Sequence, residues 1–263
     1  MKEEKQEEKI SLSSLAEELK EKIKKDKYDD SKKSEKTSSK EDKLIQEASE
    51  KITKKDIEKE TRELKKTSSK EQTLIPLEEY IKCAVHLGTK VITPHMRKFV
   101  YKRRADGLAV INTVAIDEKL REAIDFLVKY EPEQIYLCCK REAGWDAAKK
   151  FAEATNILTF TKKYPPGITT NLILENFFEK EMTLICDPWM DKNALQDTFR
   201  LKKPTISLCD TNNFTQRITK IIPCNNKAKK SIGCMLFILA REYCKAKKLE
   251  FNYSLEDFTG PLE

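Results

Sequence analysis

Two short apolar runs, each ended abruptly by polar or turn residues, constrain the fold of this chain more than any other feature. The first run covers residues 205–209 and ends at Asp210, and the second covers 218–222 and ends at Pro223. Short continuous apolar runs bounded by turn residues are typical of strands buried on both faces. A helical pattern of apolar residues follows over 232–243, so the local order is strand, loop, strand, loop, helix.

The same alternation extends through most of the chain. An Asp-Gly pair between two apolar runs predicts a hairpin around Gly107, and Gly88 is expected to end the first helix as its C-terminal cap. Short strands alternating with longer helices predict an α/β fold, Rossmann-like, with a mostly parallel sheet covered by helices on both faces. The predicted helices are 77–85, 115–130, 143–154, 192–199 and a last one that begins after Asn226 and runs to about Lys247. The predicted sheet strands are 134–139, 157–160, 182–186, 205–209 and 218–222.

Composition divides the chain near residue 72. Residues 1–70 contain 21 basic and 19 acidic residues, whereas all six Gly, nine Pro and eight Cys lie at or after Pro76. A segment with so much charge buries too little apolar surface to offset its ordering entropy, so we expect disorder or an isolated helix there. We therefore predict a charged low-complexity extension over 1–72, an α/β domain over 73–250 and an irregular tail over 251–263.

The cysteines indicate buried thiols in a reducing compartment. No Cys-x-x-Cys pair occurs, and most of the cysteines lie inside apolar runs, which argues against a zinc site or a disulfide framework. No apolar run approaches the ~20 residues that span a bilayer, and the first residues lack an apolar signal region, so we expect no membrane span and no secretory signal. The formal net charge of +7 permits a polyanionic partner without demanding one.

The motifs that bind nucleotide phosphates are absent, and we expect no cofactor. The six glycines stand too far apart for a G-x-G-x-x-G or P-loop pattern. One hypothesis is a metal-dependent α/β hydrolase in which Asp187, Asp191 and Asp210 bind magnesium or transfer protons. The alternative, which we favour, is that Asp187 and Asp210 accept backbone N–H groups as structural caps. His86 and His95 have no recognisable nucleophile partner, so we expect neither catalytic residues nor metal ligands.

Basic residues recur in the predicted loops beside tyrosine and asparagine side chains. Lysines at the start of the last helix oppose its dipole, and a bound phosphate backbone is one explanation for them. Ordinary solvation explains any single lysine equally well, but the recurrence as a set is typical of a nucleic-acid-binding surface. The candidate RNA-binding residues are Lys98, Tyr101, Lys102, Arg103, Arg104, Lys140, Arg141, Lys162, Lys163, Tyr164, Asn225, Asn226, Lys227, Lys229 and Lys230.

Short pieces in a characteristic order extend over about residues 77–247. They are His86-Leu-Gly88, Tyr101-Lys-Arg-Arg-Ala-Asp-Gly107 with Val110-Ile-Asn112, Lys150-Phe-Ala-Glu-Ala-Thr155, Tyr164-Pro-Pro-Gly-Ile-Thr-Thr-Asn171, Cys186-Asp-Pro-Trp-Met-Asp191, Pro204 to Phe214, and Ile222-Pro-Cys-Asn-Asn-Lys227 with Ala240-Arg-Glu242. In these pieces the chain resembles the small-ribosomal-subunit protein S-two family, in the archaeal and eukaryotic form that includes the laminin receptor precursors. Asn156 stands where the family usually has Gly, and Lys162-Lys163 replaces its usual Gly-Arg.

The resemblance implies a flavodoxin-like α/β layer and a structural, non-enzymatic role in translation. It implies that the protein is part of the cytoplasmic ribosome, where it binds small-subunit rRNA and neighbouring small-subunit ribosomal proteins near the junction of head and body. It implies no membrane and no small-molecule substrate. The rival classes are the hydrolase above and an adhesion or scaffold protein that uses the charged extension. Residues 1–72 match no part of the family pattern.

We predict that residues 1–70 are dispensable for folding of the α/β domain. A chain that begins at Thr73 loses a segment whose charge content is too high for a hydrophobic core. Its thermal unfolding, followed by circular dichroism, should remain cooperative with a midpoint close to that of the full chain. A fall of many degrees would show instead that the segment packs on the domain.

Overall fold

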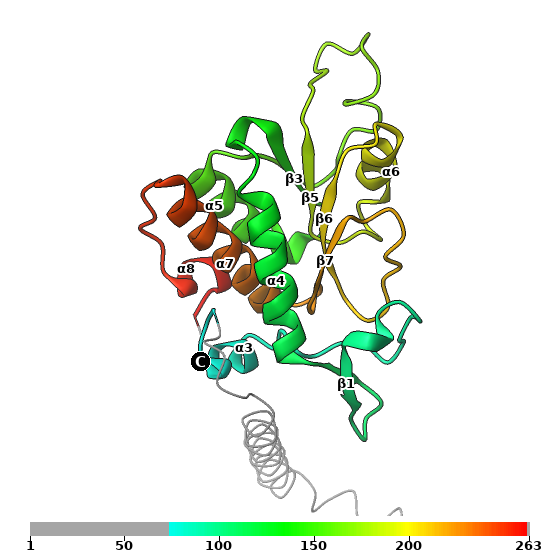
Figure 1. The fold of residues 1–263 in the computed structure, drawn as a ribbon, viewed down its shortest axis with the longest axis vertical. Helices are drawn as coiled ribbons and strands as arrows, with labels where there is room; N and C mark the ends of the chain where they lie inside the picture. The colour runs from blue at the N-terminus through cyan, green and yellow to red at the C-terminus, as the bar shows by residue number, and fades with distance from the viewer. Residues whose placement is uncertain (1–73, 262–263) are drawn as a thin grey trace, which may run out of the picture. The chain divides into compact units, whose positions relative to one another are not determined.

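A parallel sheet forms the centre of the protein, which the computed structural model describes over residues 74–261 (Figure 1). The predictions made for residues 1–72 lie outside this range. The sheet strands are β3 (Ile135–Cys139), β4 (Leu158–Thr161), β5 (Met182–Ile185), β6 (Thr205–Cys209) and β7 (Lys220–Pro223). Their order is β4-β3-β5-β6-β7, and all neighbours are parallel. Numbered from β3, this is the 2-1-3-4-5 order of flavodoxin-like folds, which confirms the predicted fold class.

The burial of the strands explains their continuous apolar sequences. Every residue of β3, β5 and β6 is buried, whereas the two outer strands are partly exposed. Along β3, Leu137 and Cys139 belong to the core on one face, and Tyr136 and Cys138 belong to the core on the other. The adjacent cysteines therefore point to opposite faces, as the strand period of two requires. All eight cysteines of the chain are free and buried.

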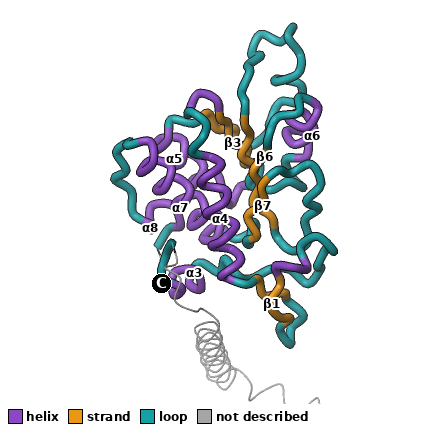
Figure 2. The backbone as a smooth tube through the Cα atoms, viewed as in Figure 1, coloured by secondary structure: helices purple, strands orange, loops and turns teal. Residues whose placement is uncertain are grey.

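Three helices cover the larger core face, as Figures 1 and 2 show. The helix α4 begins after Asn112, whose side chain accepts a hydrogen bond from the backbone N–H of Val114 at 3.1 Å. The helix α5 ends at Asn156, which has a φ of +58° and supplies the left-handed cap that glycine most often supplies. Within α7, the residues from Ser231 to Ala240 are all buried. These helices are α4 (Thr113–Leu127), α5 (Trp145–Thr155) and α7 (Lys229–Lys247).

The opposite face is covered by α6 (Lys192–Arg200) and by the connection between β4 and β5. No helix forms within that connection. Instead Tyr164 and Ile168 pack against Tyr136 and against Ala194 of α6. The predicted arrangement, with cover on both faces, is therefore confirmed, but an irregular loop supplies much of the second layer.

The segment before the sheet folds back onto the carboxyl ends of the strands. It contains α3 (Leu77–Lys82) and the antiparallel hairpin of β1 (Val100–Arg103) and β2 (Ala109–Ile111). The helix is shorter than expected because Ala84 adopts a φ of +54° and reverses the chain, so Gly88 is not its cap. Gly88 is needed for packing, since a Cβ there would lie 2.5 Å from Thr211 Cγ2.

The predicted irregular tail contains a helix, α8 (Leu255–Thr259), which corrects the expectation for residues 251–263. Ser254 and Asp257 form a capping box at its start, and the pair is a helix-start signal that the sequence carries openly. Phe258 of α8 is buried against α7, and the two helices meet where α7 carries Gly233. The remaining short elements are the 3₁₀ helices η2 (Arg97–Phe99), η3 (Pro132–Gln134) and η4 (Glu142–Gly144).

No helix within residues 74–261 combines the length and the apolar character needed to cross a membrane.

We predict that Gly233→Ala destabilises the protein by about 1–3 kcal/mol, the usual cost of overpacking. The new Cβ would lie 2.4 Å from the carbonyl oxygen of Phe258, and this neighbour is backbone that cannot rotate away. Without this contact, Gly→Ala inside a helix stabilises by roughly 1 kcal/mol. The matched control is the same substitution in a chain that ends at Glu250 and so lacks α8, where urea unfolding should show no loss. Equal losses in both backgrounds would rule out α8 as the cause.

Candidate functional site

The loops that follow the five sheet strands lie together at one side of the sheet, because parallel strands end on the same edge. We call this the carboxyl edge. The N-terminal segment joins it: Thr93 donates its hydroxyl to the carbonyl of Asn213 at 2.9 Å, and the backbone N–H of Asn225 donates to the carbonyl of Val85 at 3.0 Å. The carboxyl edge comprises residues 140–141, 162–164, 186–191, 210–217 and 224–228.

Asp187, two residues beyond the end of β5, connects three of these loops. Its Oδ2 pairs with the guanidinium of Arg141 at 2.5 Å. Its Oδ1 accepts the backbone N–H of Trp189 at 2.9 Å and the side-chain amide of Asn213 at 3.3 Å. The carboxylate is buried, so these partners replace the water that it loses on folding. Arg141 and Asp187 follow β3 and β5, the strands between which the strand order reverses and where such folds usually bind ligands.

Asp210, directly after β6, has a comparable set of partners. Its Oδ1 accepts the backbone N–H of Thr211 at 2.6 Å, and its Oδ2 lies 3.3 Å from the ammonium of Lys227. Burial raises the pKa of Asp210, and the Thr211 N–H and the Lys227 charge oppose that increase. Asn213 completes the network, since its Oδ1 accepts the N–H of Asp210 at 2.8 Å and the amide of Asn226 at 3.0 Å.

Asp191 stands at the start of α6, and its Oδ2 accepts the backbone N–H of Lys140 at 3.2 Å. Burial is the main cause that raises its pKa to about 6, and the neighbouring charge of Asp187 adds to the increase. Each of the three carboxylates is thus engaged by protein groups. In the part of the chain that the structure describes, no three His, Cys, Asp or Glu side chains form a group that could hold a metal ion. The geometry therefore does not support the hydrolase hypothesis.

Two of the candidate RNA-binding residues are buried, which corrects their expected role. Tyr164 is 4% exposed, and its hydroxyl hydrogen-bonds to Thr169 at 2.9 Å while its ring stacks against Tyr136. Asn226 is 1% exposed and holds the network around Asn213. Both follow strands, where the sequence shows polarity but does not show which side chains turn inward.

Several other candidates have structural partners that the sequence did not reveal. The side-chain oxygen of Asn225 accepts the backbone N–H of Lys227 at 3.0 Å and so stabilises the turn that leads into α7. Lys229 pairs with Asp146 at 2.6 Å, and Lys227 pairs with Asp210. These ion pairs explain why lysines are tolerated at the start of α7 without a phosphate nearby.

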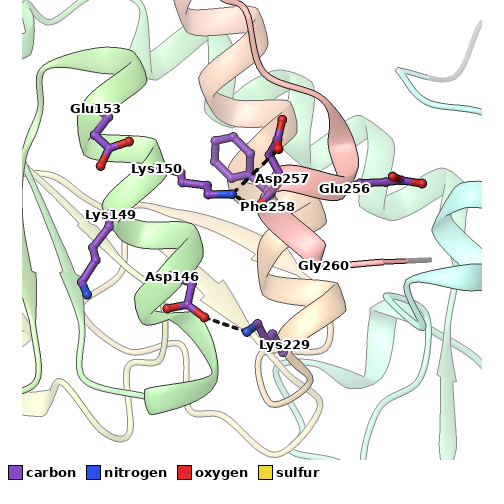
Figure 3. Close-up of a pocket in the computed structure, with 9 residues that line it drawn as sticks. All are labelled: Asp146, Lys149, Lys150, Glu153, Lys229, Glu256, Asp257, Phe258 and Gly260. Carbon is purple, nitrogen blue, oxygen red and sulfur yellow. Dashed lines mark hydrogen bonds and ion pairs between the residues drawn. The ribbon is translucent and has the colours of Figure 1, made fainter. Parts of the chain in front are cut away.

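The pocket that includes Lys229 has about 440 Å³ of space and lies between α5, the start of α7, and α8 (Figure 3). Its lining carries charges of both signs, including Lys150, which pairs with Asp257. Binding sites for small molecules are mostly apolar with a few polar groups. None of the three carboxyl-edge aspartates lines it, so this pocket is not part of the hydrolase hypothesis.

The hairpin carries the largest continuous group of candidates. A bulge at Tyr101 interrupts the β1–β2 register between Val100 and Lys102, and Tyr101 is 45% exposed. Bulges commonly re-aim a side chain. Arg103 is exposed, whereas Lys102 and Arg104 are partly buried and Arg104 lies 3.7 Å from Asp106. The remaining exposed candidates are Lys98, Lys140, Lys162 and Lys163.

Sequence reasoning did not identify the connecting role of Asn213 or the exposed aromatic side chains of the carboxyl edge. Trp189 and Phe214 are 62% and 58% exposed. Each stands one or two residues beyond a polar turn that ends a strand, in Asp187-Pro-Trp and Asn212-Asn-Phe. An aromatic residue in such a turn is a usable signal, because loops after parallel strands lie at the surface.

We predict that Asp191→Asn changes how stability depends on pH. The pKa of Asp191 is raised to about 6 in the folded protein, so the folded state holds the proton of this carboxyl more tightly than the unfolded state does. The stability that this provides is complete below the pKa of the unfolded chain, near ~4, and is lost as the pH rises through 6. Asparagine keeps an oxygen acceptor for Lys140 and cannot ionise. The variant should gain stability relative to the parent between pH 4 and 6, by up to about 1.4 kcal/mol per pH unit.

Urea unfolding at several pH values checks this prediction. Asp125→Asn, at an exposed position of α4, is the matched control and should leave the profile unchanged. Parallel profiles for Asp191→Asn and the parent would show that Asp191 ionises normally.

Comparison with known proteins agrees with the resemblance found in the sequence. The family model described as ribosomal protein S2 matches residues 173–246. Small ribosomal subunit protein uS2 of Nanoarchaeum equitans is 43% identical over 173 residues, which are 66% of this chain and 86% of that protein. The uS2 proteins of Methanococcus maripaludis strains C6 and C5 are each 39% identical over 188 residues, 70% of this chain and 85% and 86% of those proteins. This chain therefore belongs to the uS2 family of ribosomal proteins, which is structural rather than enzymatic.

Proposed function

We propose that this protein is a structural component of the small ribosomal subunit and binds its rRNA through the hairpin and the carboxyl edge. The observation that carries the proposal is the similarity to uS2 proteins, which extends over 85–86% of their length. The arrangement of the loops supports it. Parallel strands bring basic loops that are distant in sequence to one edge of the sheet.

The charges of that surface suit a polyanion. The acidic groups Asp187, Asp191 and Asp210 are buried and engaged by protein partners, whereas Lys140, Lys162 and Lys163 are exposed. The negative charges are therefore neutralised inside while positive charges face the solvent. Phosphate contacts of this kind supply most of the sequence-independent affinity for RNA.

We further propose that the protein contacts neighbouring small-subunit ribosomal proteins, near the junction of head and body, on the cytoplasmic ribosome. The position follows from the family resemblance. Co-sedimentation of the full chain with small subunits, in a magnesium-containing sucrose gradient, tests the assembly role. The protein should migrate with the small subunit at moderate salt, and its absence from that fraction would contradict the proposal.

We predict that replacing Lys102, Arg103 and Arg104 together by Ala lowers rRNA affinity and its dependence on salt. Each phosphate contact contributes about 0.7–0.9 to the slope of log affinity against log salt concentration. The slope should therefore fall by roughly 2 if all three side chains contact phosphates. Filter binding of small-subunit rRNA over a range of potassium chloride concentrations measures it.

The matched control removes the same number of positive charges from another part of the domain. Lys129, Lys149 and Lys245 are exposed and lie outside the candidate set, so their replacement by Ala should leave the slope nearly unchanged. Equal slopes for the hairpin variant and the parent would exclude the hairpin as a phosphate contact.

A further inference from the structure

Two large aromatic side chains are exposed on the carboxyl edge. Trp189 follows β5 and is 62% exposed, and Phe214 follows β6 and is 58% exposed. Side chains of this size gain free energy when their apolar surface leaves water, so two on one edge suggest that a partner covers them. Phe199 is also exposed, but the guanidinium of Arg217 already lies over its ring, 5.0 Å from the centroid.

The backbone that carries both rings is fixed by hydrogen bonds, some of them buried. The N–H of Trp189 and the side-chain amide of Asn213 donate to the same oxygen atom, Asp187 Oδ1. Phe214 directly follows Asn213, whose N–H donates to the carbonyl of Asp210 at 3.0 Å and whose carbonyl accepts from Thr93. Because this backbone is already fixed, binding costs mainly the side-chain freedom of the two rings.

The exposed charges of the carboxyl edge are mainly positive. In the loops of the carboxyl edge, Lys140, Arg217 and Lys227 are exposed, and the aspartates are buried. Glu142, in η4 beside this edge, is an exposed acid. Aromatic rings among cations form the usual surface for single-stranded nucleic acid, where bases stack on the rings and cations contact the phosphates.

We propose that Trp189 and Phe214 form a stacking platform for unpaired bases of RNA. The proposal rests on the RNA-binding function above and specifies its ligand as single-stranded nucleotides. Bases inside an A-form helix are already stacked on each other, so a duplex cannot use the rings in this way. The alternative occupant is an apolar surface of a neighbouring protein, which would need only hydrophobic area.

A second exposed apolar surface of the chain, without aromatic rings, serves as a control for the alternative of an apolar protein contact. The loop tip at Leu172, Ile173 and Leu174 is also exposed, at 76%, 91% and 41%. It belongs to the β4–β5 connection, which approaches the amino end of β3 through the bond from the N–H of Glu181 to the carbonyl of Gln134. Aliphatic side chains have no π-face on which a base can stack, so this tip is a matched apolar surface outside the proposed platform.

Affinity for small-subunit rRNA separates the platform from the phosphate contacts. Trp189→Ala in the full chain should weaken binding by about fivefold or more, the usual cost of losing one stacked base. Because no phosphate contact is lost, the salt slope should stay the same, unlike that of the hairpin variant. Ile173→Ala should change neither quantity. An affinity of Trp189→Ala equal to that of the parent would overturn the platform while leaving the RNA-binding function intact.

Substitutions of different shape distinguish base stacking from apolar contact. Trp189→Phe keeps a π-face and should retain most of the affinity, whereas Trp189→Leu keeps apolar area without a π-face and should bind as weakly as Trp189→Ala. If Trp189→Leu binds small subunits as well as the parent does, the ring serves an apolar protein contact and the proposal is wrong.

Fluorescence tests the stacking directly, without ribosomal components. The chain has two tryptophans, so Trp145→Phe leaves Trp189 as the reporter. Single-stranded oligoadenylate of about 12 nucleotides should quench its emission, and a duplex RNA of the same length should not. Phe214→Ala should weaken the apparent affinity measured by this quenching. Absence of quenching by the single strand, or equal quenching by the duplex, would overturn the platform.

Discussion

The buried carboxylate of Asp187 is the group on which the carboxyl edge depends. It is placed where a parallel strand ends, and it connects Arg141, Trp189 and Asn213, which belong to three different loops. A buried charge is stable only when it is paired, and removing one partner of such a pair typically costs about 3–5 kcal/mol. The loops are therefore held in one arrangement by the requirement to satisfy this charge. The backbone positions of the outward-facing side chains are fixed in the same way.

Asp187 also occupies the position at which flavodoxin-like sheets usually bind a ligand. In such sheets, ligands usually enter the crevice between the strands where the order reverses. Here those strands are β3 and β5. Arg141 and Asp187, each two residues beyond the end of its strand, pair with each other. The two polar groups at the usual ligand position of such sheets thus contact each other. The exposed part of this edge includes lysines and two aromatic rings.

Much of the fold could be predicted because its causes are local. Period and propensity located the strands and the principal helices, and the strand period alone placed Cys138 and Cys139 on opposite faces. Predictions were wrong where a distant contact decided the outcome. Gly88 is required by Thr211 rather than by its own helix. The helix α8 is a different case, because its capping box is a local signal in the sequence that the expectation of an irregular tail overlooked. The domain boundary near residue 72 stays a prediction.

The sequence by itself determined the strand and helix pattern, the absence of a nucleotide-binding glycine motif, and the resemblance to a ribosomal family, because each depends on residue order alone. Only the tertiary structure decided which polar residues face the solvent. Tyr164 and Asn226 turn inward, whereas Trp189 and Phe214 remain outside. The reason is that burial depends on which loops the sheet order brings together. A carboxylate such as Asp187 acquires its partners from strands far away in sequence, and no local pattern encodes that pairing.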